Sequence, residues 1–222
     1  MTQTFRPRLD VLPEPQRQLW HELAALPKDY VLYGGTAIAL HLGHRDSIDF
    51  DFFISRSIDP RRLLEDLPIL RGARVTQLEP ETLSVTVDRD GPIKLSFFGV
   101  PKLGRVRDPL ATDDIGLPVA DLLDLSGAKV SVVQVRAEAK DYIDVGAMLK
   151  AGLSLPQMLS AGLAMYGPTF TPQAGLKSLC YFDEPNLTAL PITLKDLLRA
   201  AVKGVDLAML PDVQPVEPRT QT

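Results

Sequence analysis

Two aspartates stand two residues apart inside one of the most apolar stretches of the chain. Asp49 and Asp51 lie in "SIDFDFFIS" (47–55), where Ile and Phe fill most of the other positions. This alternation of β-branched and aromatic residues predicts a β-strand. Both carboxylates would then point to one face, with Phe50 and Phe52 on the opposite, core-facing side. The Cα atoms of the two aspartates would lie about 6.6 Å apart, two residues at roughly 3.3 Å each.

Two carboxylates this close repel each other unless a proton, a basic side chain or a cation lies between them. Mg²⁺ accepts one or two carboxylates and completes its shell with water and substrate phosphates. Asp49 and Asp51 are therefore candidate ligands for Mg²⁺ (or Mn²⁺). Two alternatives stay open, because edge strands often carry alternating polar residues and because Arg45 is near enough in sequence to pair with one acid.

A double glycine precedes the aspartates and has a chemistry of its own. "YVLY" (30–33) predicts a short buried strand, which Gly34 and Gly35 turn into a helix that ends at Gly43. The first amides of a helix have no partner inside it, and the helix dipole favours anions there. This arrangement binds phosphate, and the Thr36 hydroxyl would either contact phosphate or cap the helix. A purely structural turn is the alternative.

The remaining pattern predicts the elements that position these residues. Helices are expected over 14–27 and 59–70, antiparallel strands over 73–79, 82–89 and 93–100, a loop over 101–116, and helices from Val119 onwards. This order predicts an α+β protein whose mixed sheet, flanked by helices, is followed by a helical C-terminal half. We expect an α/β core with an N-terminal helix over 1–116, a helical region over 117–210 and a disordered tail over 211–222.

Composition narrows the functional class. The 222 residues carry a net charge of −4, which gives no overall attraction to nucleic acid. A single cysteine, Cys180, excludes an internal disulfide and suits a reducing cytosol. No apolar run approaches the roughly 20 residues that cross a bilayer, and the N-terminus lacks the apolar core of a signal peptide. A cytoplasmic protein with no membrane partner is expected.

The combination of motifs resembles a known superfamily. A hydrophobic strand ending in Gly-Gly, a short helix and then acid-x-acid is similar to the signature of DNA polymerase β-like nucleotidyltransferases. "GGTAIALHLGHRDSIDFDFF" (34–53) more closely resembles the AbiEii/AbiGii-type nucleotidyltransferase toxins, effectors of bacterial toxin–antitoxin and abortive-infection systems. The resemblance implies a polymerase β-like nucleotidyltransferase sheet and helical C-terminal half, with NTP bound by Gly34, Gly35, Thr36, Arg45 and Ser47.

The segment 117–149 extends the resemblance into the helical half. In that family, a lysine on one helix and a Lys-Asp-x-x-Asp motif on the next helix complete the site. The matching positions are Lys129 for the first and Lys140, Asp141 and Asp144 for the second. The resemblance implies that Lys129 neutralises the β- and γ-phosphates and that Asp141 orients Lys129 or acts as a base. Helical periodicity also places both side chains on apolar faces, where a charge needs a partner. A structural salt bridge between the two helices is the alternative, and "KVSVVQV" (129–135) also fits a strand.

One position departs from the polymerase-like pattern. Such enzymes usually supply a third carboxylate from a later strand, and in "IKLSFFGV" (93–100) Ser96 stands where the acid is expected. The resemblance otherwise implies transfer of NMP from an NTP to an RNA, especially a tRNA 3′ end, or to a protein hydroxyl. A cognate antitoxin would be a partner. The missing acid keeps open a second class, a catalytically degenerate nucleotide-binding or regulatory module.

Overall fold

The structure, a computed structural model, describes residues 3–216 and divides into two compact units. Unit 1 comprises the chain up to Leu103 together with Pro109–Ala120, and unit 2 comprises Gly104–Asp108 and the chain from Asp121 onwards. The predicted α+β fold class, a mixed sheet flanked by helices with a helical C-terminal part, is confirmed. Of the predicted tail over 211–222, residues 217–222 lie outside the described part of the chain.

Unit 1 contains an eight-stranded mixed sheet in the order β1-β7-β8-β2-β3-β6-β5-β4. Its strands are β1 (Thr4–Phe5), β2 (Val31–Tyr33), β3 (Asp49–Ile54), β4 (Arg74–Glu79), β5 (Thr82–Asp88), β6 (Pro92–Gly99), β7 (Leu110–Thr112) and β8 (Pro118–Val119). β3 pairs with β2 in antiparallel and with β6 in parallel orientation, while β4, β5 and β6 form the predicted antiparallel run. The strand of the paired aspartates is therefore central to the sheet.

The helices of unit 1 are shorter than the sequence pattern suggests. They are α1 (Glu14–Trp20), α2 (Gly34–Leu42) and α3 (Pro60–Asp66), and 3-10 turns over His21–Ala25 and Pro68–Leu70 follow α1 and α3. The two predicted helices over 14–27 and 59–70 are each interrupted at a proline, because the helical conformation is unfavourable for the residue that precedes a proline. Leu26, before Pro27, and Leu67, before Pro68, are accordingly extended. The predicted stop at Gly43 is confirmed, with φ of +64°.

The predicted loop over 101–116 is only partly a loop. It contains β7, and Val119, where helices were expected to begin, belongs to β8 instead. Strands of three and two residues are too short for any periodicity to show in the sequence. They exist because β7 pairs with β1 and β8, and because β8 pairs with β2, so the backbone hydrogen bonds come from distant segments.

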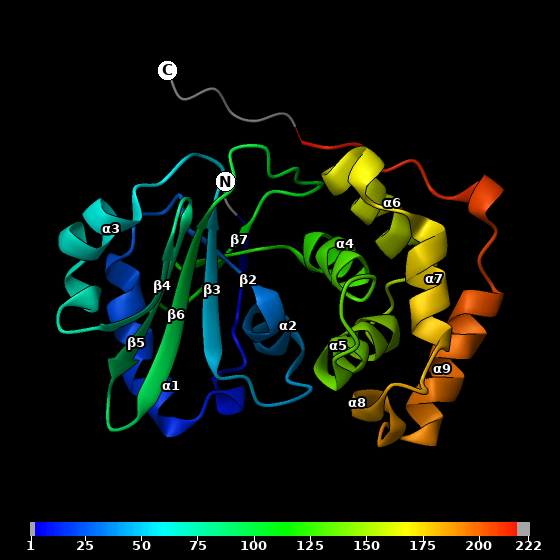
Figure 1. Ribbon diagram of the computed structural model, residues 1–222, viewed down its shortest axis with the longest axis horizontal. Coiled ribbons are helices and arrows are strands. Elements are labelled where there is room, and N and C mark those ends of the chain that lie inside the picture. Colours follow the sequence, from blue (N-terminus) through cyan, green and yellow to red (C-terminus); the bar gives the residue numbers. More distant parts are fainter. Residues whose placement is uncertain (1–2, 217–222) are drawn as a thin grey trace. The chain divides into compact units, whose positions relative to one another are not determined.

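An aromatic stack fixes one face of the central strands. The rings of Phe50 and Phe52 lie 6.4 Å apart and those of Phe52 and Phe97 5.3 Å apart, while Trp20 of α1 packs 6.5 Å from Phe50. Figure 1 shows α1 on one side of the central strands and α2 on the other. Because buried aromatic side chains fill the α1 side of β3, side chains that bind a ligand or react must lie on its opposite face.

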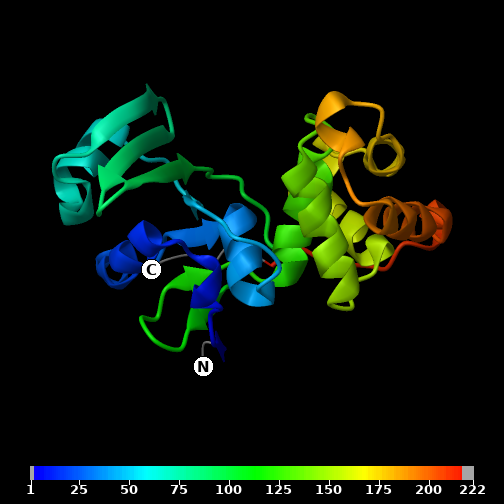
Figure 2. The same ribbon diagram turned by 90° about the horizontal axis from the view of Figure 1, so that it is seen from below.

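Unit 2 consists of helices joined by short connections (Figure 1 and Figure 2). They are α4 (Leu122–Val132), α5 (Ala139–Lys150), α6 (Leu155–Tyr166), α7 (Pro172–Cys180), α8 (Pro185–Thr188) and α9 (Ile192–Lys203). The ambiguous "KVSVVQV" segment begins in α4, so the helical interpretation is the correct one up to Val132. α4 and α6 pack closely at Gly127, where an added Cβ would lie 2.9 Å from the Gly162 backbone nitrogen. Within residues 3–216 no helix has the length and apolarity needed to span a bilayer.

A buried carboxylate holds the Gly104–Asp108 segment against α4. Asp124 is 1% exposed, and its Oδ1 accepts a hydrogen bond of 3.0 Å from the Val106 amide. Its other oxygen, Oδ2, is buried and has no hydrogen-bond partner among the described residues. Burial raises the pKa of Asp124 to about 7. Burial and the nearby Asp124 charge likewise raise the pKa of Tyr166 to about 12.

Asp124→Asn is expected to flatten the pH dependence of stability. Because the folded-state pKa is raised from 3.8 to about 7, the native protein keeps a proton that the unfolded chain releases. The free energy of unfolding therefore falls as pH rises from about 4 to about 7, by on the order of 4 kcal/mol at about 1.4 kcal/mol per pKa unit. Urea titrations at pH 4–8 would measure this, with Asp183→Asn on the exposed surface as the control. Equal pH slopes in wild type and Asp124→Asn would contradict the assignment.

Candidate functional site

The two aspartates of β3 share one face, as the alternation predicts. Asp49 and Asp51 are half-buried, whereas Phe50 and Phe52 between and after them are fully buried in the core. In the register of the sheet, Asp49 pairs with Lys94 and Asp51 with Ser96 of β6. The carboxylates therefore occupy the face of the central strand that the aromatic stack does not use.

The glycine turn meets the second aspartate directly. Tyr33, the last residue of β2, pairs with Asp51, and Gly34 follows it with φ of +74°. A Cβ at Gly34 would lie 2.6 Å from Asp51 Oδ2, closer than real Cβ atoms come to any neighbour. Since α2 begins at Gly34, its first amides, which have no partner within the helix, belong to the same corner of unit 1. The phosphate-type donors and the carboxylate predicted from sequence thus converge.

Gly34→Ala tests this convergence. The substitution places a left-handed backbone under a strain of roughly 1–2 kcal/mol and also drives a methyl group into Asp51. We expect a loss of the nucleotide transfer implied by the sequence resemblance that is well beyond the loss of stability, measured by transfer rate and melting temperature. Gly72→Ala is the matched control, because Gly72 has φ of +75° but nothing within 4 Å of an added Cβ. If both variants lose transfer equally, strain alone explains the effect and the contact with Asp51 does not matter.

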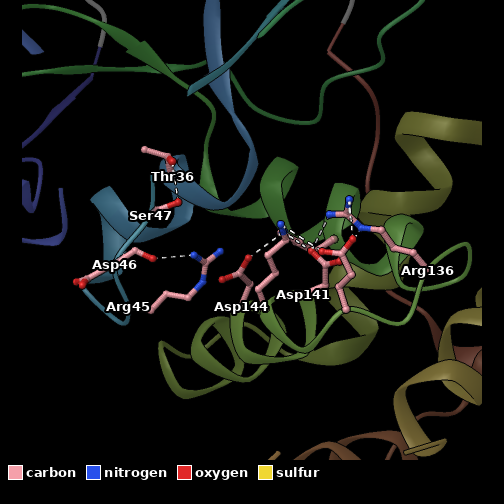
Figure 3. Close-up of polar contacts among 10 residues, drawn as sticks. Thr36, Arg45, Asp46, Ser47, Arg136, Asp141 and Asp144 are labelled. Carbon is pink, nitrogen blue, oxygen red and sulfur yellow. Dashed lines mark hydrogen bonds and ion pairs between the residues drawn. The ribbon is translucent and has the colours of Figure 1, made fainter. Parts of the chain in front are cut away.

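Two predicted nucleotide contacts instead bond to each other. The hydroxyl oxygens of Thr36 and Ser47 lie 2.7 Å apart (Figure 3). Thr36 Oγ1 also donates to the Asp49 carbonyl. Thr36 is 2% and Ser47 8% exposed. These hydroxyls therefore join α2 to the beginning of β3, and their predicted contact with a nucleotide stays a prediction.

The other predicted nucleotide ligands lie around the same segment. Gly35 is the second residue of α2 and is half-buried. Arg45 is half-buried in the connection between α2 and β3, and its Nη1 donates a 2.9 Å hydrogen bond to the Asp46 carbonyl (Figure 3). That bond joins the guanidinium to the carbonyl of the next residue in the same connection.

The donor set of the corner suits a cation that is shared with a substrate. No cluster of three or more His, Cys, Asp or Glu residues within the described residues is arranged to hold a metal ion. Ser96, beside Asp51, is 1% exposed and accepts a 3.2 Å hydrogen bond from Ser84, so no third carboxylate stands there. Asp49 and Asp51 would supply two oxygen ligands, and water and phosphate oxygens would complete the shell that Mg²⁺ requires.

Unit 2 carries a buried cluster of charges. Lys129 of α4 donates to Asp141 Oδ1 at 2.6 Å and lies 2.8 Å from Asp144 Oδ2, both on α5. Arg136, in the connection between these helices, contacts Asp141 Oδ2 at 2.8 Å through Nε and Oδ1 at 3.2 Å through Nη2 (Figure 3). The side chains of Asp141 and Asp144 are 0% and that of Lys129 9% exposed.

The predicted inward orientation of Lys129 and Asp141 is confirmed by this cluster. Both Asp141 oxygens accept from cationic donors, an arrangement that holds Lys129 and Arg136 in place. Sequence reasoning matched Asp144 to the family motif but gave it no role. Its position three residues after Asp141 puts both on one face of α5, which is the signal for a second carboxylate on the same ammonium.

Comparisons with known proteins identify the family and the fold. The family model described as nucleotidyl transferase AbiEii toxin, type IV TA system, matches residues 17–218. An uncharacterized protein of Aquifex aeolicus (strain VF5) is 28% identical over 178 residues, which cover 78% of this chain and 84% of that protein. Among solved structures, the nucleotidyltransferase toxin MenT4 of Mycobacterium tuberculosis H37Rv shares the fold, with a TM-score of 0.58, 15% identity and coverage of 86% of this chain and 84% of its own. The family match spans nearly the whole chain, so this protein belongs to the AbiEii family of nucleotidyltransferase toxins of type IV toxin–antitoxin systems.

Proposed function

We propose that the protein transfers a nucleoside monophosphate from an NTP to an acceptor hydroxyl in a reaction that depends on Mg²⁺ or Mn²⁺. The acceptor oxygen forms a bond to the α-phosphorus, the bond from that phosphorus to the α,β-bridging oxygen breaks, and pyrophosphate leaves. The observation that carries the proposal is the approach of Gly34 to Asp51, where an added Cβ would lie 2.6 Å from Oδ2. Family membership supports the same chemistry.

Unit 1 would bind the reacting end of the nucleotide. The backbone amides at Gly34 and Gly35 begin α2 and would receive the triphosphate oxygens. Asp49 and Asp51 would hold the cation through their shared face. A bound Mg²⁺ would neutralise the triphosphate and polarise the reacting oxygens. The fully buried Phe50 and Phe52 keep the strand rigid, so the carboxylates need little reorganisation during the reaction.

For Lys129, in unit 2, the family resemblance implies a role of its own, neutralisation of the β- and γ-phosphates. Asp141 would act as a positioning residue rather than as a base, since Lys129 and Arg136 occupy both of its oxygens. Asp144 would hold the same ammonium at 2.8 Å. The roles proposed for the unit 2 residues can be tested independently of those in unit 1, because substituting one of them leaves the residues of unit 1 unchanged.

A second candidate function follows from Ser96. A hydroxyl bonded to Ser84 stands beside Asp51 in place of a third carboxylate, which favours a module that binds nucleotide without transferring it. If transfer occurs, the proton of the acceptor hydroxyl passes to a weaker base than a strand carboxylate. Binding of NTP without any transfer would identify this second function.

The acceptor and the biological partner are proposed from family membership. A toxin–antitoxin system pairs each toxin with an antitoxin that counteracts it, so we expect a cognate antitoxin to accompany this chain in the cytoplasm. RNA, especially the tRNA 3′ end, is the proposed acceptor, and a protein hydroxyl is the alternative.

The proposal is tested by the fate of differently labelled phosphates. The purified protein is incubated with Mg²⁺, total RNA or total protein, and each NTP labelled in turn at the α- or γ-phosphate. Transfer of the α-label to a macromolecule, with the γ-label released as pyrophosphate, is expected. Transfer of the γ-label would indicate a kinase instead. No transfer from any NTP, together with no nucleotide-dependent rise in melting temperature, would overturn the proposal.

A further inference from the structure

The two residues before β3 and its first residue, Asp49, are held by three other segments of unit 1. The Ser47 amide donates to the Val11 carbonyl at 3.2 Å, the Gln16 side chain donates to the Ile48 carbonyl at 3.0 Å, and the Thr36 hydroxyl donates to the Asp49 carbonyl. Three consecutive residues are therefore each fixed by a different partner. We call Gln16, Thr36 and Ser47 the β3 clamp.

Gln16 is the least expected member of the clamp. It is 3% exposed, and its Oε1 is buried with no hydrogen-bond partner within the described residues. A buried amide oxygen without a partner costs free energy, so filling space in the core does not by itself explain a glutamine at this position. Ile48, whose carbonyl Gln16 holds, has a side chain 56% exposed and thus little packing of its own. The hydrogen bond from Gln16 is what fixes this point of the chain.

The hydroxyl pair has only one consistent direction. The Asp49 carbonyl can only accept a hydrogen bond, so the Thr36 hydroxyl donates its one proton to that carbonyl. Ser47 must then donate to the Thr36 oxygen across 2.7 Å. Neither hydroxyl retains a proton for a phosphate oxygen. Both side chains are buried. Their contribution is to the backbone that carries Asp49.

We propose that Gln16 and Thr36 are positioning residues that aim the Asp49 carboxylate, beside Asp51, at the cation bound with the triphosphate. This inference rests on the proposed function and deepens it. A carboxylate at the first residue of a strand, next to an exposed isoleucine, would otherwise swing with its loop. The clamp fixes the backbone on one side of Asp49, and the aromatic neighbour Phe50, fully buried, fixes it on the other.

Isosteric variants test the clamp through metal binding. Thr36→Val and Gln16→Met remove the donors with little change of volume, and Thr36→Ser keeps the hydroxyl. Binding of Mn²⁺ is measured by electron paramagnetic resonance with a non-hydrolysable NTP analogue, and transfer is measured against Mg²⁺ concentration. We expect roughly ten-fold weaker Mn²⁺ binding and a matching rise in the Mg²⁺ requirement, as for lost supports of metal ligands elsewhere. The KM for NTP at saturating Mg²⁺ should stay within two-fold, and Thr36→Ser should restore wild-type values.

A matched control separates positioning from general stability. Thr112 is also a buried threonine of unit 1, and its hydroxyl accepts a 3.1 Å hydrogen bond from the Leu117 amide. Thr112→Val should lower stability without changing Mn²⁺ binding. Amide hydrogen exchange should accelerate at Ile48–Asp51 in the clamp variants and elsewhere in the control.

The possible failures are distinguishable. If the wild type neither binds Mn²⁺ with the NTP analogue nor transfers nucleotide, the proposed function is wrong, and so is the positioning role proposed for the clamp. If the wild type does both and Thr36→Val and Gln16→Met bind Mn²⁺ equally well, the clamp alone is overturned. Weakening that Thr112→Val reproduces would also overturn it.

Discussion

Asp51→Asn is expected to lower nucleotide transfer by at least about 10²–10³-fold, the typical effect of removing one preorganised electrostatic group from a reaction site. The amide keeps the shape of the carboxylate but loses the negative charge that would hold a cation against the triphosphate. Because Asp51 is half-buried on a strand whose other face is core, we expect the melting temperature to change little or to rise slightly. Single-turnover transfer of α-labelled NTP and thermal unfolding are the two measurements.

Asp88→Asn supplies the matched control for this substitution. Asp88 ends β5 at an exposed position, so the same chemical change should leave transfer within about two-fold of wild type. Retention of more than a tenth of wild-type transfer by Asp51→Asn would show that this carboxylate is not a metal ligand in the reaction. Loss of transfer together with a collapse of the melting temperature would point to a structural role instead.

Lys129→Met is expected to lower the free energy of unfolding by about 3–5 kcal/mol, the cost of breaking a buried ion pair by removing one partner. The ammonium lies between Asp141 and Asp144, both fully buried. The charge cluster consists of these three residues and Arg136, so without Lys129 the two carboxylates keep one cation from the cluster, Arg136. Urea unfolding followed by a probe in unit 2 measures the effect.

Two further variants decide the cause of that loss. Lys140→Met removes a lysine whose side chain is 51% exposed and pairs with Glu138 at 3.2 Å, so it should cost less than about 1 kcal/mol. Lys129→Met combined with Asp144→Asn should be less destabilised than the sum of the single variants, because the uncompensated charge is gone. Additive losses would mean that Lys129 stabilises the fold by packing rather than by pairing.

Local sequence signals predicted much of unit 1. The common face of Asp49 and Asp51 follows from the two-residue period of a strand, and the end of α2 at Gly43 follows from the left-handed conformation that glycine adopts. The helix after Asp59 begins as expected, with that side chain accepting from two backbone amides. These features depend on neighbours within a few residues, which is why one sequence suffices to find them.

Contacts between segments far apart in the sequence cannot be predicted from such local signals. Gln16 holds the carbonyl of Ile48, 32 residues away. Helical spacing places Gln16 on the same face as Leu19 and Trp20, but it does not show which distant group the amide meets. β7 and β8 owe their existence to pairing with strands distant in the chain. The inward orientation of Lys129 was predictable from helical periodicity, but its sharing by two carboxylates depends on how α4 packs against α5. The sequence pattern shows which side chain faces inward, and tertiary packing decides what it meets.

The path of the chain between its two units has a consequence for how such genes diversify. The polypeptide leaves unit 1 after Leu103, returns at Pro109 and leaves again after Ala120. Val106, in the short excursion, is 1% exposed and bonded to Asp124. A single crossover within residues 109–120 of two related genes would therefore join residues 104–108 of one parent to helices of the other. Chimeras that exchange the helical unit should remain foldable only when residues 104–108 travel with it.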